Sequence, residues 1–245
     1  MLLHFCESTA FALLKSMKWK LLMNSSLQSG DRPYGDRQDY HCLLFVLDSA
    51  NLHCFFEFLQ KGFFVKVVTG KSIKQMLCDQ FGVQPDYAVN RIKTIFYDGK
   101  PVDDMDRAIV RDGSTLAFSA AMPGLVGATF RSGGELSPFR STISYRPDIR
   151  QTSDSKEGVV FIKLFNLLVS EMGPAFLCRG ILIEKKLLDS FLKNQSIDFW
   201  SRCSSVFLGN HPMEKEKLMH DGVPGTEKFV LLKLKTIPQK NNVKS

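Results

Sequence analysis

The stretch RIKTIFYDGKPVDDMDRAIVRDGSTLAFSAA, residues 91–121, decides the fold expected for this chain. Its apolar run TIFY at 94–97 predicts one β-strand, and LAFS at 116–119 predicts another. Two Asp-Gly pairs, Asp98-Gly99 and Asp112-Gly113, stand between them, and glycine supplies the positive φ angle that tight turns need. We therefore expect a strand, a turn, an acidic loop, a second turn and a closing strand.

Two strands and a helix are predicted just before this stretch. HCLLFVLD at 41–48 and GFFVKVV at 62–68 are short runs of apolar, β-branched and aromatic residues, which is typical of strands. The residues that then recur at helical spacing are Ile73, Met76, Leu77 and Phe81. Gly82 follows where a helix commonly ends. The order strand, strand, helix, strand, turn, strand predicts one α+β domain over 41–121.

A degraded copy of this order recurs in the second half. CLLFVLDSANLHCFFEFLQKG at 42–62 lies without a gap over VFIKLFNLLVSEMGPAFLCRG at 160–180, so that Gly62 meets Gly180. The later matches keep the same order: FFVKVV with ILIEKK, the predicted helix with 187–192, TIFYDGKP with SVFLGNHP at 205–212, and the closing strand with Asp221-Gly222 and 229–234. The sequence therefore predicts a duplication, with a second, divergent domain over 159–235.

The remaining segments flank or join these domains. Residues 1–40 are predicted to form an amphipathic N-terminal helix and a linker; the helix would dock on the body, lie on a membrane surface, or belong to an extension outside the folded unit. Residues 122–158 are rich in Gly, Ser, Pro and Arg but contain many apolar side chains, which predicts a partly ordered connector held against one domain. Residues 236–245 are expected to be a flexible tail.

The predicted order resembles the β-grasp (ubiquitin-like) superfamily, and most closely its sulfur-carrier branch, which includes the small subunit of molybdopterin synthase and the thiamine sulfur carrier. The resemblance rests on the helix after the second strand, on IFYDGKPV, and on DGSTLAFSAA, which is similar to the DGD-x-V-x-x-x-P ending of those carriers. It covers residues 41–121. It implies two tandem β-grasp domains, each with a mixed sheet packed on one helix.

The resemblance also implies a possible chemistry. Carriers of this family act through a carboxy-terminal Gly-Gly whose carboxylate is adenylated and converted to a thiocarboxylate. The pair Gly133-Gly134 follows the first closing strand here, but the chain continues to Ser245. A carrier tail would therefore exist only after proteolytic processing at Gly134.

The residue pattern predicts no enzyme, no metal site and no cofactor. His41-Cys42 and His53-Cys54 are adjacent pairs, and neighbours on a strand point to opposite faces rather than forming a catalytic dyad. His211 and His220 have no Cys or His partner at zinc-ligand spacing, and neither a phosphate loop nor a G-x-G-x-x-G motif is present. The carboxylates Asp103, Asp104 and Asp106 could bind a cation or a basic partner, but such clusters are usually solvated loops.

Composition disfavours two classes of partner, and the resemblance to ubiquitin-like domains implies a protein partner. The net charge is +7, but Lys and Arg are dispersed along the chain, so a nucleic-acid partner is not favoured. No apolar run is long enough to span a bilayer, and membrane contact is expected only through the N-terminal helix. Six scattered cysteines favour free thiols in a reducing cytoplasm. We expect a non-enzymatic module that docks a protein through a sheet face or edge of the first domain. The candidate contact residues, all in MPGLVGATF, are Met122, Pro123, Leu125, Val126 and Phe130.

Overall fold

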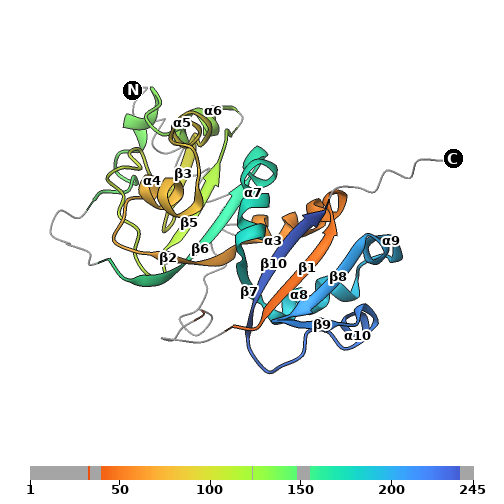
Figure 1. The fold of residues 1–245 in the computed structure, drawn as a ribbon. Helices are drawn as coiled ribbons and strands as arrows, with labels where there is room; N and C mark the ends of the chain where they lie inside the picture. Colours follow the sequence, from red (N-terminus) through yellow and green to blue (C-terminus); the bar gives the residue numbers. More distant parts are fainter. Residues whose placement is uncertain (1–32, 34–39, 123, 148–154, 238–245) are drawn as a thin grey trace. The chain divides into compact units, whose positions relative to one another are not determined.

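The computed structural model describes residues 33, 40–122, 124–147 and 155–237 of the chain (Figure 1). In these ranges it holds ten β-strands, paired both parallel and antiparallel, and eight α-helices, so the expected α+β class is confirmed. The described residues divide into two compact units. Those of unit 1 lie between 66 and 166, and those of unit 2 are 33, 40–65 and 167–237.

Unit 1 has the strand order β4-β3-β5-β6-β2. Its elements are the second half of β2 (Phe63–Val68), α4 (Ile73–Gln75) continued by a π-helical turn (Met76–Gln80), α5 (Pro85–Arg91), β3 (Thr94–Tyr97), β4 (Lys100–Pro101), β5 (Thr115–Ser119), α6 (Gly124–Phe130), a 3₁₀-helix (Ser137–Arg140) and β6 (Glu157–Phe165). β3 pairs antiparallel with β4 and β5, whereas β5 and β6 are parallel.

Local sequence explains how these elements begin and turn. Asp98 and Gly99 both have positive φ, at 48° and 77°, and reverse β3 into β4, while the Asp98 carboxylate accepts a 2.7 Å hydrogen bond from the backbone N–H of Thr115. The helix at α4 starts at a capping box in which Ser72 and Gln75 bond each other's backbone N–H. The predicted turns at 98–99 and 112–113 and the helix after β2 are therefore confirmed.

An amide side chain occupies the exposed end of β2. Gln80 accepts a 2.7 Å hydrogen bond from the backbone N–H of Val68 and donates a 2.9 Å hydrogen bond to its carbonyl. This is the pair of bonds that a neighbouring strand would make. Gln80 therefore continues the ladder beside β2 with a side chain in place of a strand.

Unit 2 has the strand order β2-β7-β10-β1-β8-β9, counting the first half of β2. Its other elements are β1 (Cys42–Asp48), a 3₁₀-helix (Ser49–Phe55), α3 (Phe56–Lys61), α7 (Leu167–Arg179), β7 (Ile181–Glu184), α8 (Lys185–Lys193), α9 (Ile197–Ser201), β8 (Cys203–Leu208), β9 (His211–Met213), α10 (Lys215–His220) and β10 (Phe229–Ile237). β1 is parallel to β10 and antiparallel to β8.

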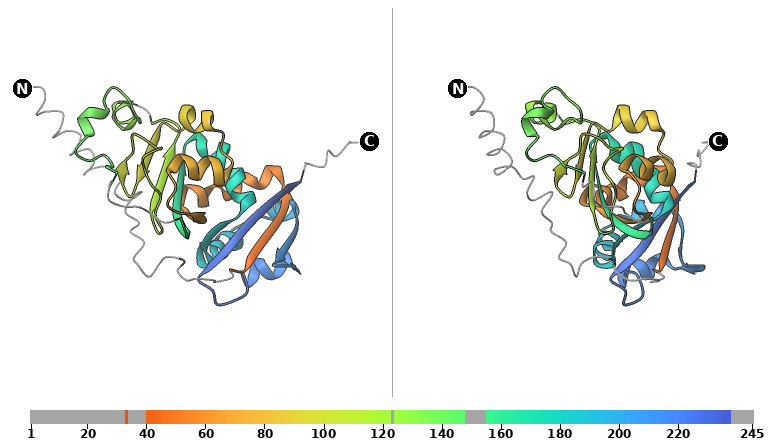
Figure 2. Two further views of the ribbon diagram at one scale, coloured as in Figure 1. Left: turned by 60° about the vertical axis from the view of Figure 1, so that its left-hand side comes forward. Right: turned by 90° about the vertical axis from the view of Figure 1, so that its left-hand side faces the viewer.

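Helices pack against the sheet of unit 2 (Figure 2), and aromatic side chains fill the core between them. Phe45 of β1 lies 5.7 Å from the ring of Phe55 and 6.5 Å from that of Trp200, and Phe55 lies 5.0 Å from Phe191 of α8. Phe176 of α7 packs edge-to-face on Phe63 of β2, with the ring centroids 5.2 Å apart. One face of β1 is thus covered by the 3₁₀-helix, α8 and α9.

The strands occur where the sequence predicts them, but they are shared between the units differently than expected. β1, from the predicted domain 41–121, lies in unit 2, and β6, from the predicted domain 159–235, lies in unit 1. The two predicted ranges are therefore not the two compact units. Each unit also contains several helices rather than one. The physical reason is that β1 and β6 have similar apolar patterns. Local sequence therefore does not specify which closing strand each of them pairs with.

The predictions for the ends fall largely beyond the described part of the chain. The helix expected in residues 1–23 lies outside the described residues, as does all of the expected linker except Pro33, which is buried, and Tyr40. At the other end, β10 continues to Ile237, so the tail expected from residue 236 begins inside a strand. Residues 238–245 lie outside the described part.

Candidate interaction surface

The connector after β5 covers one face of the unit 1 sheet. Phe130 of α6 is 9% exposed and clusters with Phe96 of β3 and Ala117 of β5, the Phe96 and Phe130 rings lying 5.3 Å apart. Met122 and Val126 pack against the same cluster. Three of the five predicted contact residues therefore face their own sheet. Of the other two, Leu125 is 70% exposed and Pro123 lies outside the described residues.

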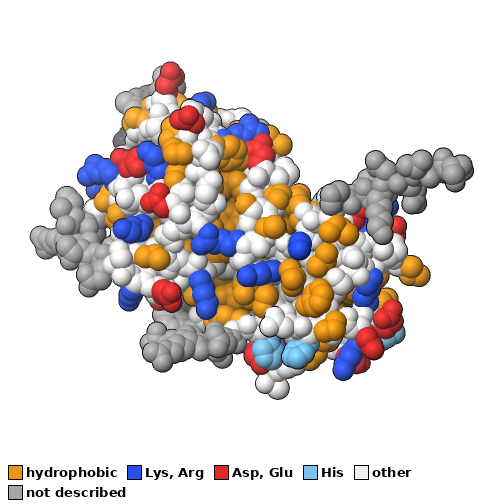
Figure 3. Space-filling model, in the orientation of Figure 1, with side chains coloured by type: hydrophobic (Ala, Val, Ile, Leu, Met, Phe, Trp, Pro, Cys, Tyr) orange, Lys and Arg blue, Asp and Glu red, His pale blue; other side chains and the backbone are white. Residues whose placement is uncertain are grey.

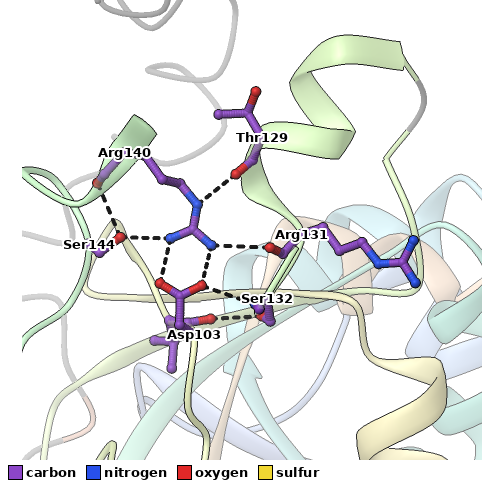
Figure 4. Close-up of polar contacts among 8 residues, drawn as sticks. Asp103, Thr129, Arg131, Ser132, Arg140 and Ser144 are labelled. Atoms are coloured by element: carbon purple, nitrogen blue, oxygen red, sulfur yellow. Dashed lines mark hydrogen bonds and ion pairs between the residues drawn. The ribbon is translucent and has the colours of Figure 1, made fainter. Parts of the chain in front are cut away.

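A buried arginine fastens this connector (Figure 4). Arg140 is 2% exposed, and its two terminal nitrogens donate to the two carboxylate oxygens of Asp103, at 3.0 Å and 2.6 Å. Its other bonds run from Nε to the Thr129 carbonyl at 2.7 Å, from Nη1 to Ser144 Oγ at 2.7 Å and from Nη2 to the Arg131 carbonyl at 3.3 Å. All five guanidinium N–H groups thus have acceptors, which is what allows this charge to be buried.

The acidic cluster after β4 is engaged within the protein. Asp103 holds Arg140, Asp106 forms a 3.0 Å ion pair with Lys74, and Asp104 accepts a 2.9 Å hydrogen bond from the backbone N–H of Asp106. The ion pair between Asp103 and Arg140 ties the connector to the loop after β4, and we call this pair the latch. Sequence spacing did not indicate it, because Arg140 lies more than thirty residues from Asp103.

The glycine pair proposed as a carrier tail lies in a turn beside this latch. Gly133 has a φ of 61° and its N–H donates to Asp103 at 3.2 Å. The Gly134 N–H donates to the carbonyl of Arg131 at 3.1 Å, and its own carbonyl accepts from Ser137 at 2.9 Å. Gly133-Gly134 is therefore hydrogen-bonded on both sides in the intact chain.

The pair His53-Cys54 lies on a 3₁₀-helix, so the expectation based on strand geometry does not apply to it. The Cys54 sulfur is 3.7 Å from His53 Nε2, and His53 Nδ1 lies 2.6 Å from the carbonyl of Ala50. Burial is the main cause that raises the pKa of the Cys54 thiol above its ordinary value, and Asp198 adds to it. Because the thiolate is the nucleophilic form, this environment disfavours nucleophilic chemistry at Cys54.

A buried lysine was missed by the sequence analysis. Lys163, in the middle of β6, is 5% exposed, and burial lowers the pKa of its ammonium group. Its Nζ lies 5.6 Å from the ring centroid of Phe161. The signal available in the sequence was a single lysine inside the apolar run VVFIKLF.

The second face of β1 carries apolar side chains that are only partly covered. Leu43, Phe45 and Leu47 are fully buried beneath the helices, whereas Leu44 and Val46 point the other way and are partly exposed. Register places Leu44 between Phe207 and Lys233, and Val46 between Ser205 and Lys235. We call this surface the β1 face; its residues are Leu44, Val46, Phe207, Leu231, Lys233 and Lys235.

Figure 3 looks onto this part of unit 2 and shows hydrophobic side chains lying beside Lys and Arg. On a sheet covered by helices on one side only, the other side normally carries polar residues in alternation. Contiguous apolar side chains in that position are typical of an interaction surface.

The two end strands of the strand order, β4 and β9, are poor sites for strand addition. β4 is two residues long and contains Pro101, whose carbonyl already accepts a 2.8 Å hydrogen bond from Tyr145 of the connector. β9 is three residues long and contains Pro212. Short edges with proline resist pairing with a further strand. A face is therefore a better candidate surface than these edges.

No group of three or more His, Cys, Asp or Glu in the described residues could hold a metal ion. The five cysteines that the structure describes are all free thiols. None of the described helices combines the length and hydropathy needed to cross a membrane. Comparison with known proteins gave no match to this chain among family models, curated proteins or solved structures.

Proposed function

We propose that this chain is a non-enzymatic protein-binding module that docks its partner on the β1 face. The observation that carries the proposal is the pair Leu44 and Val46, which lie in the middle of the sheet, face away from the helices and remain partly exposed. Burying such side chains against a partner removes apolar surface from water, at roughly 25 cal/mol per Å².

The β1 face also favours a particular partner chemistry. Lys233 and Lys235 lie on β10 directly beside Leu44 and Val46. A complementary surface therefore has an apolar centre and carboxylates along one side. Leu44 and Val46 belong to the range 41–121 expected from sequence, whereas Phe207, Lys233 and Lys235 come from the second half, and none of the proposed connector residues is part of this surface.

Matched substitutions test the site. Leu44→Glu places a charge on the β1 face, while Leu125→Glu places the same charge at a more exposed position on α6. Partners captured by proximity labelling in cells are to be purified and titrated against both variants. We expect Leu44→Glu to abolish binding and Leu125→Glu to retain it. Loss on Leu125→Glu with retention on Leu44→Glu would assign the contact to α6 and refute the β1 face.

The charged side of the surface has its own test. Lys235 is exposed, so Lys235→Glu leaves the core intact and reverses one charge beside Val46. With a partner that carries carboxylates, we expect weaker binding whose difference from the parent chain shrinks as salt is raised. A partner bound equally well by Lys235→Glu would rule out the acidic rim.

The alternative function is a sulfur carrier active after processing at Gly134. It requires Gly133-Gly134 to leave its hydrogen bonds with Asp103 and Arg131 and the following peptide bond to be cleaved. Intact-mass analysis of the protein from its native source distinguishes the two functions. A species ending at Gly134 supports the carrier, and a full-length chain as the only species excludes it.

A further inference from the structure

The first strand of each half lies beside the closing strand of the other half. β6, which opens the second half, runs parallel to β5, with Leu116 opposite Ile162. β1, which opens the first half, runs parallel to β10, with Leu43 opposite Leu232. The exchange of first strands is reciprocal, although the first half also places its 3₁₀-helix, α3 and the start of β2 in unit 2.

β1 and β6 hold equivalent places in the two halves. In the gapless overlay, β1 is followed by helix, glycine and β2, and β6 by helix, glycine and β7. The two glycines have nearly the same positive φ, 115° at Gly62 and 111° at Gly180. Equal backbone conformation at matched positions supports the duplication independently of side-chain similarity.

Neither strand is a removable edge. Leu43, Phe45 and Leu47 of β1 are fully buried, as are Val160, Ile162 and Leu164 of β6. β1 lies between β10 and β8, and β6 lies between β5 and β2. Without its received strand, a unit would expose an apolar slot and a row of unpaired backbone groups on both sides of it.

We propose that the two halves have exchanged their first strands and that each half supplies the strand without which the other half does not fold. The chain then consists of two mutually complementing fragments, and the partner that fits the slot of one half is the other half of this same chain. Two independent tandem domains would behave differently, since each would fold alone.

Trp200 reports whether β1 is in place. It is 5% exposed and packs against Phe45, which comes from the other half of the sequence. The chain contains two tryptophans, so Trp19→Phe leaves Trp200 as the single fluorophore. A protease recognition sequence inserted after Arg150 then divides the folded chain into its two halves.

We expect the cleaved chain to elute as one species with the Trp200 emission of the intact chain. After denaturation and separation, the second half alone should emit at longer wavelength and unfold without cooperativity. Adding the first half should restore the short-wavelength emission. Two outcomes would refute the proposed strand exchange. One is that the cleaved halves separate without denaturant; the other is that the second half alone keeps the short-wavelength emission and unfolds cooperatively.

Two neighbouring substitutions supply the matched control. Phe45→Glu charges the buried side of β1, and Leu44→Glu charges its partly exposed side. A first half carrying Phe45→Glu should fail to restore Trp200 emission, and one carrying Leu44→Glu should succeed. Restoration by both variants would show that complementation does not use β1 as the structure places it.

Discussion

The latch between Asp103 and Arg140 makes a sharp prediction for stability. Asp103→Ala leaves a guanidinium that is 2% exposed without its counter-ion and without two charged hydrogen bonds. Breaking a buried ion pair from one side costs about 3–5 kcal/mol. Because the Asp103 side chain is 38% exposed, water screens the pair in the native chain, so we expect about 3 kcal/mol, the lower end.

Hydrogen exchange locates this loss. The amide N–H groups of Ser132 and Tyr145 join the connector to Lys93 and Pro101, and we expect both hydrogen bonds to open more often when Asp103 no longer holds Arg140. A loss of about 3 kcal/mol corresponds to a roughly hundredfold faster exchange at these two amides. Unchanged exchange in Asp103→Ala, or a stability within about 0.5 kcal/mol of the parent in urea, would refute the latch.

A double substitution separates charge from packing. Arg140→Met together with Asp103→Ala removes both charges, so no buried cation is left unpaired. We expect the double variant to be less destabilised than the sum of the two single variants, giving a coupling energy of about 1–3 kcal/mol. Additive effects would mean that the two side chains act independently.

Three further outcomes are expected. Lys163→Met should raise the free energy of unfolding by about 1 kcal/mol at pH 7, because an ammonium group with a burial-lowered pKa is replaced by an apolar side chain. Gln80→Leu should lower the free energy of unfolding by about 1–2 kcal/mol, because two hydrogen bonds are lost. The control Gln60→Leu, at an exposed position, should change the free energy of unfolding little. In the folded chain, exposed Cys178 should alkylate quickly at pH 8, and buried Cys203, whose pKa is raised to about 11, should not.

The sign of the Lys163 effect can be checked against pH. Its pKa is lower in the folded than in the unfolded chain, so the penalty for burying it is greatest at low pH and disappears as pH rises past the ordinary lysine value. The difference in stability between Lys163→Met and the parent should therefore shrink toward alkaline pH. A difference in stability that does not change with pH would mean that the effect comes from packing rather than from the charge of Lys163. For the other two predictions, an equal loss at Gln60 or rapid alkylation of Cys203 would contradict the structure.

The sequence predicted most of the strands and, among the described helices, α4 and α8, because their signals are local. The turn at Asp98-Gly99 needs positive φ, and the helix at Ile73 begins with a side-chain cap, so a few adjacent residues specify each. α7 was not predicted, since LLVSEMGPAFLCR contains Pro174 and lacks a clear apolar stripe. It is helical because five of its side chains and Gly173 are buried, which depends on residues distant in sequence.

The candidate surface was predictable only in part. The apolar pattern of MPGLVGATF was recognised correctly, but local pattern does not say whether Val126 and Phe130 contact a partner or their own sheet. Arg140 was missed because it is one arginine in a Gly- and Ser-rich stretch and its partner Asp103 is distant in sequence. The β1 face depends on strand order, since Leu44 is neighboured by Phe207 and Lys233, which come from the far end of the chain.

The pairing of β1 with β10 has a consequence for synthesis on the ribosome. β1 leaves the ribosome well before its partners β8 and β10, which lie in the second half of the sequence. Until then β1 lacks both of its neighbouring strands, and contacts of such long sequence separation form slowly. Newborn chains should therefore rely on chaperones until β10 has left the exit tunnel, and a chain truncated shortly before residue 229 should be prone to aggregate.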